Sequence, residues 1–217
     1  MKLTVFGATG GTGSQVVSQA LGAGHDVLAV VRDPARLPVT HPCLTVLTAD
    51  VMRPAGIAEA VAGRDAVISA LGHSRSKQER KTASPTLCAD SARAITTAMR
   101  EAGSRRLVIV SASGPFPDKG DGPLLRYVAK PLLGRTVFAV PWRDLVAMEE
   151  VVRASGLDWT VLRPPQLTDN PLTGRYRTRQ GMNLRGGLRV SRADLAHLAL
   201  AVAGDPDTYR ATIFLAD

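Results

Sequence analysis

The sequence is poor in several features that mark particular classes of protein. Two of its 217 residues are cysteines, too few for a disulfide framework or a four-cysteine zinc site. We expect both, Cys43 and Cys88, to be buried thiols. Aromatic residues make up 4% of the chain, which leaves few rings to stack on nucleic acid bases. No apolar run approaches the ~18 residues of a membrane span, and glycines interrupt the apolar start too early for a secretory signal. These absences predict a cytoplasmic protein with neither nucleic acid nor membrane as its partner.

Short β-branched runs alternate with helical patterns along the chain. The runs are apolar on successive residues, which is typical of strands buried on both faces of a parallel sheet. The alternation predicts an α/β fold, a Rossmann-type doubly wound parallel sheet flanked by helices. The length fits a single domain covering residues 1–217. Predicted strands are 2–6, 26–31, 44–48, 66–69, 106–110, 158–162 and 212–215, and predicted helices are 12–23, 54–61, 85–102, 143–155 and 192–203.

Two segments fit this pattern poorly. Residues 113–141 contain five prolines and four glycines, and residues 164–189 are polar and rich in arginine. Both follow predicted strands, so both should lie at the carboxyl edge of the sheet, where open α/β folds bind ligands. We expect them to be irregular loops on the substrate side.

A glycine-rich turn follows the first predicted strand and opens the first predicted helix. Its glycines are spaced G-x-x-G-x-x-G, a variant of the dinucleotide fingerprint G-x-G-x-x-G. Glycine permits the tight turn and lets a pyrophosphate approach the backbone, while the helix N-terminus offers free N–H groups. A plain tight turn is the alternative interpretation. The residues expected to bind the cofactor here are Gly7, Thr9, Gly10, Gly11, Thr12 and Gly13.

Arg32 and Arg36 follow the second predicted strand. At this place an acidic residue binds the ribose 2′-hydroxyl of NAD, whereas an arginine accommodates the 2′-phosphate of NADP. Two guanidinium groups could bracket that phosphate with charge-assisted bonds, so we predict NADPH over NADH. Asp33 is the complication, because a carboxylate pointing at the ribose would favour NADH. A solvated surface pair is the other interpretation of the arginines.

Two further strand ends face the same predicted crevice. Asp50 and Val51 follow the third strand, at a place suited to the adenine. Ala70, Leu71 and Gly72 follow the fourth, where glycine lets the chain pass close to the cofactor.

Seven stretches of the chain carry a wider resemblance. They are residues 6–13, 31–33 with 36–38, 61–67, 155–157, 163–165, 171–174 and 191–195. Together they resemble the atypical short-chain dehydrogenase/reductase group with an NmrA-like NAD(P)-binding domain, and within it the biliverdin reductase B/flavin reductase family. The most specific motifs are Pro-Leu-Thr-Gly at 171–174 and Ser-Arg-x-Asp-Leu at 191–195, where Ser191 and Asp194 also form a capping-box pattern.

The resemblance implies a parallel Rossmann sheet that binds NADPH at the residues named above. It also implies that Ser111, Pro164, Pro165 and Gln166 border the nicotinamide. The chain departs from the family at the substrate end. Ala112 replaces a second hydroxyl, Gln166 replaces a histidine, and the 113–141 segment is longer, which weakens the case for a bilin substrate.

No acid–base constellation stands out. Tyr127 and Lys130 are one residue short of the Tyr-x-x-x-Lys pair of many short-chain reductases, and we interpret them as a surface tyrosine beside a solvated lysine. Ser111 and Ser113 are the candidate catalytic residues, since they could hydrogen-bond a substrate or the carboxamide. Their alternative is to satisfy the chain turn at a strand end. The histidines have no metal-ligand spacing, so no metal is expected, and His73 reads as a solvated loop residue.

Much of the net charge of +8 lies in two clusters. We favour a solvated basic face over an electrostatic funnel for an anionic acceptor such as flavin mononucleotide. The clusters are Arg175, Arg177, Arg179, Arg185, Arg189 and Arg192, without an acid, and Arg75, Lys77, Arg80 and Lys81, offset by Glu79.

The sequence therefore predicts an NADPH-dependent oxidoreductase with NADP as its cofactor. Hydride would pass to a small-molecule acceptor, a flavin, a quinone or a similar conjugated compound that takes its proton from solvent. The rival is a non-catalytic NADP(H)-sensing regulator of the NmrA-like kind, and an epimerase or lyase is a third, weaker reading. The acceptor and the oligomeric state stay open.

Overall fold

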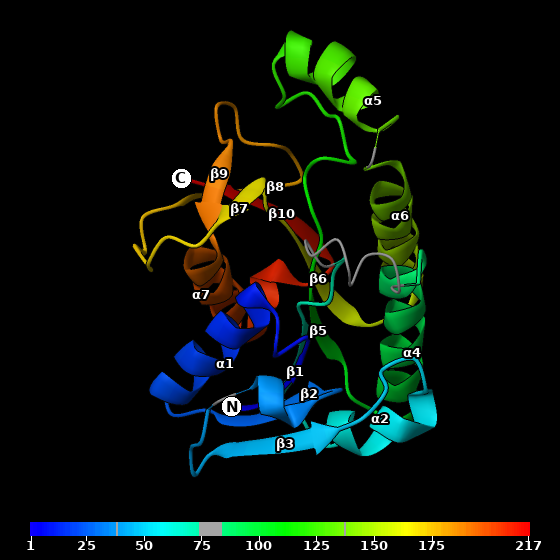
Figure 1. Cartoon of the computed structure of the whole chain (residues 1–217), viewed down its shortest axis with the longest axis vertical. Coiled ribbons are helices and arrows are strands. Elements are labelled where there is room, and N and C mark those ends of the chain that lie inside the picture. Colours follow the sequence, from blue (N-terminus) through cyan, green and yellow to red (C-terminus); the bar gives the residue numbers. More distant parts are fainter. Residues whose placement is uncertain (38, 74–83, 137) are drawn as a thin grey trace.

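A twisted, mostly parallel sheet forms the centre of the molecule (Figure 1). The computed structural model describes residues 1–37, 39–73, 84–136 and 138–217, and within these ranges eight strands pair in the order β3-β2-β1-β4-β5-β6-β10-β8. They are β1 (Lys2–Phe6), β2 (Asp26–Val31), β3 (Leu44–Thr48), β4 (Ala66–Ser69), β5 (Arg106–Val110), β6 (Asp158–Arg163), β8 (Arg177–Gln180) and β10 (Ala211–Ala216).

The strand order reverses at the middle of the sheet. From β1 the chain proceeds outward through β2 to β3, then crosses back to β4 on the other side of β1 and continues to β5 and β6. These pairs are all parallel, and β8 alone runs antiparallel, along β10. The reversal between β1 and β4 is the switch point at which open α/β sheets bind ligands. The predicted α/β doubly wound fold is confirmed.

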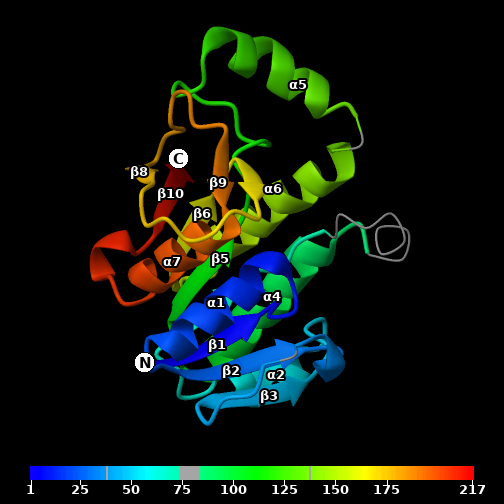
Figure 2. The ribbon, with the colours of Figure 1, turned by 60° about the vertical axis from the view of Figure 1, so that its left-hand side comes forward.

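Helices cover both faces of the sheet (Figure 2). The helices α1 (Gly11–Gly22) and α7 (Arg192–Ala203) pack together on one face. The helices α2 (Pro54–Val61), α4 (Leu87–Glu101) and α6 (Ala139–Ala154) pack in a row on the other. Helix α6 begins four residues before its predicted start. None of the helices in the described ranges has the length and apolar content that crossing a membrane requires.

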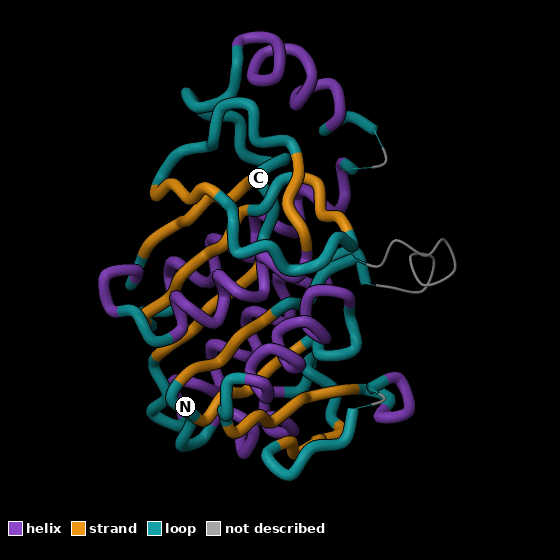
Figure 3. Tube along the Cα trace, turned by 90° about the vertical axis from the view of Figure 1, so that its left-hand side faces the viewer, coloured by secondary structure: helices purple, strands orange, loops and turns teal. Residues whose placement is uncertain are grey.

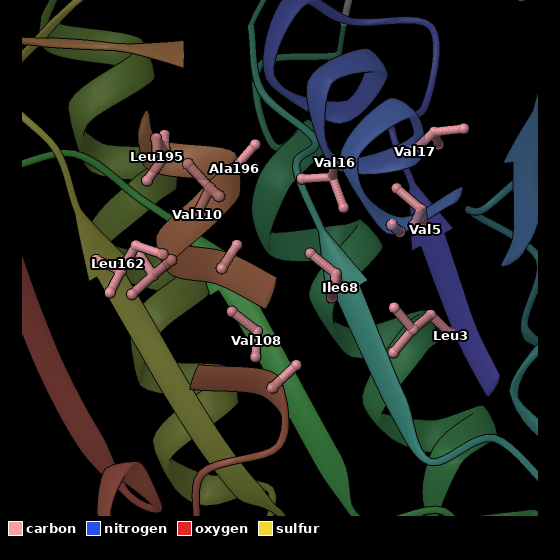
Figure 4. Packing of buried hydrophobic residues seen from close by; sticks show 14 of the residues in the cluster. Leu3, Val5, Val16, Val17, Ile68, Val108, Val110, Leu162, Leu195 and Ala196 are labelled. Atoms are coloured by element: carbon pink, nitrogen blue, oxygen red, sulfur yellow. The ribbon is translucent and has the colours of Figure 1, made fainter. Parts of the chain in front are cut away.

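The central strands β1, β2, β4, β5 and β6 are apolar because each one contributes side chains to two cores. On the α1 and α7 side lie Val108 and Val110 of β5 (Figure 4). On the α2, α4 and α6 side lie Leu107 and Ile109 of the same strand. Successive side chains of a strand point to opposite faces, so a strand covered twice has no polar face to show in its sequence.

The two segments expected to be irregular contain short elements (Figure 3). Within 113–141 lie the π-helical turn η2 (Leu125–Ala129), helix α5 (Lys130–Leu133) and the start of α6. Pro131 lacks an N–H donor, and the π-helical turn directly precedes it. Within 164–189 lie β7 (Gln166–Thr168) and β8, and β7 pairs with β9 (Arg189–Ser191) beside the main sheet.

Candidate functional site

The glycine-rich turn joins β1 to α1 at the switch point. Gly7 has a φ of +77°, and a Cβ there would lie 2.8 Å from the carbonyl oxygen of Ala70. A Cβ on Gly13 would lie 2.1 Å from the carbonyl oxygen of Gly7. Glycine is therefore required at both positions. Gly7 lets β1 and β4 end side by side, and Gly13 lets α1 pack against the turn.

Helix α1 begins without a side-chain cap. Gly10 is its N-cap residue and so offers no capping side chain, and the first turn holds no acidic residue. The first N–H groups of a helix have no partner within the helix, and together with the helix dipole they attract an anion. This turn, with Thr9 and Gly10 accessible and Thr12 and Gly13 buried, has the form of a phosphate-binding loop.

Arg192 is a site residue that sequence reasoning missed. Its side chain crosses the glycine-rich turn, where a Cβ on Gly11 would lie 2.7 Å from its Cδ and 2.8 Å from its Nε. Its guanidinium also pairs with Asp169. Arg192 is the first residue of α7, so the packing of α7 on α1 brings a cation to the start of α1. From the sequence, Arg192 was assigned only to a basic cluster. Its position in the Ser-Arg-x-Asp motif is the feature that could have identified it as part of the site.

The turn after β2 places both predicted arginines at the surface. Arg32 and Arg36 are both exposed, Arg32 before the 3-10 turn η1 (Pro34–Arg36) and Arg36 as its last residue. Asp33 is the N-cap residue of that turn, and its carboxylate Oδ1 accepts a hydrogen bond from Ala35 N at 3.1 Å. One carboxylate oxygen of Asp33 is thereby engaged in local structure.

The ends of β3 and β4 lie at the same edge of the sheet. Asp50 is exposed, and its Oδ1 accepts from Met52 N at 3.0 Å, while Val51 is buried in the core below. Ala70 and Leu71 are half-buried, and Ala70 N donates to Phe6 O at 3.0 Å. Gly72 is exposed.

The structure brings Ser111, Ser113 and Pro164 together at the ends of β5 and β6. Ser111 N donates to Leu162 O at 2.8 Å, and Ser113 N donates to Pro164 O at 2.9 Å. Pro165 is half-buried beside them, and Gln166 is exposed at the start of β7.

The hydroxyl of Ser111 is held in a buried charged cluster. It donates to Glu149 Oε1 at 2.7 Å. Arg163 donates two hydrogen bonds to the same carboxylate, from Nε to Oε1 at 2.9 Å and from Nη2 to Oε2 at 2.6 Å. Arg153 forms an ion pair with this carboxylate as well. The guanidinium of Arg163 lies 3.4 Å from the ring centre of Phe116. A bidentate arginine–carboxylate pair fixes the relative orientation of its two side chains. The cluster therefore holds the side chains beneath the ends of β5 and β6 in place.

Comparison with known proteins decides the family. The family model described as NAD(P)H-binding matches residues 7–206. The chain belongs to the NAD(P)H-binding family. The match runs from the glycine-rich turn to the segment after α7.

One relative of this NAD(P)H-binding protein spans nearly its whole length, and another about half of it. It is 24% identical over 213 residues to the uncharacterized protein YwnB of Bacillus subtilis, covering 95% of this chain and 94% of that one. A 3-beta-hydroxysteroid dehydrogenase of Mycolicibacterium neoaurum is 29% identical over 118 residues, which are 52% of this chain and 32% of that one.

Two solved structures share the fold. A short-chain dehydrogenase/reductase from Veillonella parvula in complex with NADP superposes with a TM-score of 0.82 at 18% identity, covering 100% of this chain and 94% of that one. The oxidoreductase ylbE from Lactococcus lactis gives 0.79 at 18% identity, covering 100% and 91%.

Tyr127 and Lys130 lie in different surroundings in this NAD(P)H-binding protein. Tyr127 is exposed, as predicted. Lys130 was expected to be solvated, and this is wrong. Its side chain is 6% exposed and its Nζ lies 2.7 Å from Asp121 Oδ2, with further bonds to the carbonyls of Ser113 and Phe116. All of these partners of Lys130 belong to the segment 113–141 that contains the lysine itself.

His73 was also expected to be solvated, and this is wrong. Its side chain is 14% exposed, and its Nε2 donates to Asp144 Oδ2 at 2.8 Å. The Asp144 carboxylate also accepts from the N–H groups of Cys88 and Ala89 at the start of α4, at 2.8 and 2.9 Å. Burial alone would raise the pKa of Asp144, but the hydrogen bonds from His73 and the helix outweigh it and lower that pKa.

The thiol beside this carboxylate is buried. Burial raises the pKa of Cys88, and the negative charge of Asp144 raises it further. His73, Cys88 and Asp144 offer ligand atoms within 4.8 Å of one another. The carboxylate, however, already accepts bonds from the ring and from a helix N-terminus, whose dipole disfavours a cation. The group is therefore a helix cap. Cys43, expected to be buried like Cys88, is exposed.

The two motifs most specific to the resemblance bind each other. Ser191 Oγ accepts from Asp194 N at 2.9 Å, which confirms the predicted cap of α7. The Asp194 carboxylate accepts from the N–H groups of Thr173 and Gly174 at 3.0 and 2.8 Å, so it fastens the Pro-Leu-Thr-Gly turn to α7. Burial alone would raise the pKa of Asp194, but the bonds from Ser191, Gly174 and Thr173 lower it.

The first basic cluster is mostly solvated. Apart from Arg192, which is half-buried, its arginines are exposed on β8, on the first residue of β9 and on the loops around them. The second cluster, Arg75 to Lys81, lies outside the described residues.

Proposed function

We propose that this NAD(P)H-binding protein is a cytoplasmic NADPH-dependent reductase that passes hydride to a flavin, a quinone or a similar conjugated acceptor. The observation that carries the proposal is the uncapped start of α1 behind a turn in which Gly7 and Gly13 leave no room for a Cβ, with two exposed arginines one strand away. The start of α1 suits the negative charge of a pyrophosphate, and the two arginines suit the negative charge of a 2′-phosphate.

The state of Asp33 supports NADPH over NADH. One of its carboxylate oxygens caps the 3-10 turn that carries Arg36, so the acid stabilises the loop that presents the arginines. Arg192 adds a third cation, beside Gly11, where the pyrophosphate would lie. The solved relative from Veillonella parvula contains NADP. We also propose the finer grouping with the flavin reductase-like, NmrA-like proteins, on the interlocked motifs at 171–174 and 191–195.

The surroundings of the nicotinamide end support an acceptor that needs no protein acid. NADPH supplies the hydride when it is bound. Ser111 holds its hydrogen in the bond to Glu149 and keeps oxygen lone pairs for a donor such as the carboxamide. Ser113 and Pro164 are fixed by their backbone bond. These residues would orient the ring rather than move a proton, which suits flavins and quinones because their reduced forms take the proton from water.

Arg32→Ala tests the cofactor assignment. Loss of a hydrogen bond to a charged group costs about 1.5–3 kcal/mol, which weakens NADPH binding roughly ten- to hundredfold. NADH binding should stay unchanged, because NADH lacks the 2′-phosphate. Arg93→Ala is the matched control, since Arg93 is exposed on α4 and pairs with Asp90 on its own helix. Equal losses for NADPH and NADH in a titration would contradict the assignment.

A non-catalytic NADP(H)-sensing regulator is the second candidate. It is favoured by the same bond of Ser111 to Glu149, because a residue occupied in a buried ion cluster is a poor catalyst. A sensor binds NADP(H) with the same preference for the 2′-phosphate but turns over no acceptor. Turnover assays with several acceptors therefore separate the two candidates.

A further inference from the structure

One segment gathers a large share of the exposed apolar side chains of the described residues. We call residues 122–136 with 138–140 the arm; it contains η2 and α5 and leads into α6. Figures 1 and 2 both show its helical part standing away from the sheet. Leu124, Tyr127 and Leu132 are 74%, 68% and 63% exposed. Other exposed apolar side chains of the arm are Val128, Leu133, Phe138 and Val140.

The helical part of the arm is two-sided. Leu124, Val128 and Leu132 follow one another at intervals of four residues, so they share one side of the helical run. Lys130, by contrast, is buried and holds Asp121 and two carbonyls of the loop below. The apolar side therefore faces away from the protein.

The arm is anchored at both ends, so its exposure is built into the fold. Asn183 from the loop after β8 donates to Asp121 Oδ2 and to Phe116 O, each at 3.2 Å. At the other end, Trp142 fits against two glycines: a Cβ on Gly114 would lie 2.7 Å from its ring, and one on Gly134 would lie 3.3 Å from it. These contacts hold the helical part of the arm away from the sheet.

The charge of the arm has a single sign. No acidic residue occurs between Asp121 and Asp144 in the sequence. The charge of Lys130 is balanced by Asp121, whereas Arg135 is exposed and Arg126 is half-exposed beside the ring of Tyr127. Arg143, three residues beyond the arm in α6, is exposed as well. The surface is thus apolar with arginines around it.

We propose that the arm docks the protein on the surface of an anionic lipid bilayer. Amphipathic helices with an apolar side and basic flanks lie in the interface of such membranes, with aromatic and leucine side chains among the lipids and the arginines at the headgroups. A second copy of the chain fits less well, because a two-fold contact through the arm sets its arginines against one another. The sequence prediction of no membrane partner rests on the lack of a spanning segment, which surface docking does not need.

The arm is attached next to the carboxyl ends of β5 and β6, where the proposed function places the acceptor. Lys130 holds Ser113, and Ser113 in turn is bonded to Pro164. If the proposed function holds, docking brings that edge to the lipid surface, and the acceptor class becomes a quinone dissolved in the bilayer.

Vesicle sedimentation with the full chain tests the docking. We expect binding to vesicles of phosphatidylglycerol and phosphatidylcholine, weaker at high salt, and at least tenfold less to pure phosphatidylcholine. The double variant Leu124→Ser, Leu132→Ser should lose this binding with an unchanged melting temperature, because both side chains are exposed. Leu188→Ser is the matched control, since Leu188 is 66% exposed off the arm and its variant should bind like the wild type.

Three outcomes overturn the docking: no binding to anionic vesicles, binding that the double variant retains, or a dimer in solution that the double variant separates. The quinone extension has its own readout. The double variant should lose NADPH oxidation with a long-chain quinone in vesicles but keep it with soluble menadione. Vesicle binding without turnover of any acceptor would refute the proposed function and leave the docking intact, whereas turnover without vesicle binding would refute the docking alone.

Discussion

Gly13→Ala is the sharpest structural test of the phosphate-binding turn. The new Cβ would lie 2.1 Å from the carbonyl oxygen of Gly7 and 2.6 Å from its carbonyl carbon, whereas ordinary contacts of a Cβ begin at 3.4 Å. Both atoms are backbone, so no side chain can swing aside. Either α1 or the turn must move, and overpacking of this kind costs about 1–3 kcal/mol, here at the upper end.

That cost should appear in thermal unfolding. For a domain of this size, each kcal/mol lowers the melting temperature by about 2–4 °C, so we expect a loss of roughly 6–12 °C. A displaced turn also loses its fit to the pyrophosphate. NADPH at about a hundred times its dissociation constant stabilises a protein by about 2.7 kcal/mol, and this stabilisation should shrink or vanish in the variant.

Two neighbouring glycines serve as controls. Gly22→Ala lies in the same helix with no atom within 4 Å of the new Cβ, so it should gain stability, by up to about 1 kcal/mol. Gly11→Ala meets only the side chain of Arg192, so it should be nearly as stable as the wild type. A Gly13→Ala protein with the melting temperature of the wild type and its full stabilisation by NADPH would refute the reasoning.

Three other changes probe the site and its surroundings. Asp194 has a lowered pKa in the folded protein, so its stabilisation is present above about pH 3.9, the ordinary value, and is lost as pH falls through the lower folded value. Asp194→Asn should therefore cost about 1.5–3 kcal/mol at pH 7 and progressively less as pH falls below about 3.9; a constant difference in melting temperature would contradict this. Tyr127→Phe should leave NADPH turnover unchanged, because the phenol is exposed and Lys130 is occupied by Asp121; a large loss of turnover would restore the pair as catalytic. Lys130→Met leaves Asp121 buried without its cation and should lower stability by about 3–5 kcal/mol in denaturant unfolding; a neutral result would mean that the arm is not held by this pair.

Seven of the eight strands of the sheet were predictable because their signals are local, whereas β8 is polar and was expected to be part of an irregular loop. The strand runs, the glycine-rich turn and the cap of α7 by Ser191 are each written in a few adjacent residues, and the structure has them where they were expected. The parallel topology followed from strands such as β5, whose apolar residues face two cores.

The side chains that were misjudged depend on contacts that the sequence pattern does not show. Lys130 and His73 read as solvated because nothing nearby shows that Asp121 and Asp144 bury them. Arg192 reaches the glycine turn only through the packing of α7 on α1. The helical part of the arm was hidden by its prolines, which usually mark loops, although Pro131 occupies the first turn of α5, where proline is tolerated.

The most direct test of the central claim is NADPH oxidation by the purified protein, followed by the loss of NADPH absorbance, with flavin mononucleotide, menadione and biliverdin as acceptors. We predict turnover with flavin mononucleotide or menadione, faster with NADPH than with NADH. Tight NADP binding with no turnover of any acceptor would contradict the reductase and identify the protein as a sensor of NADP(H).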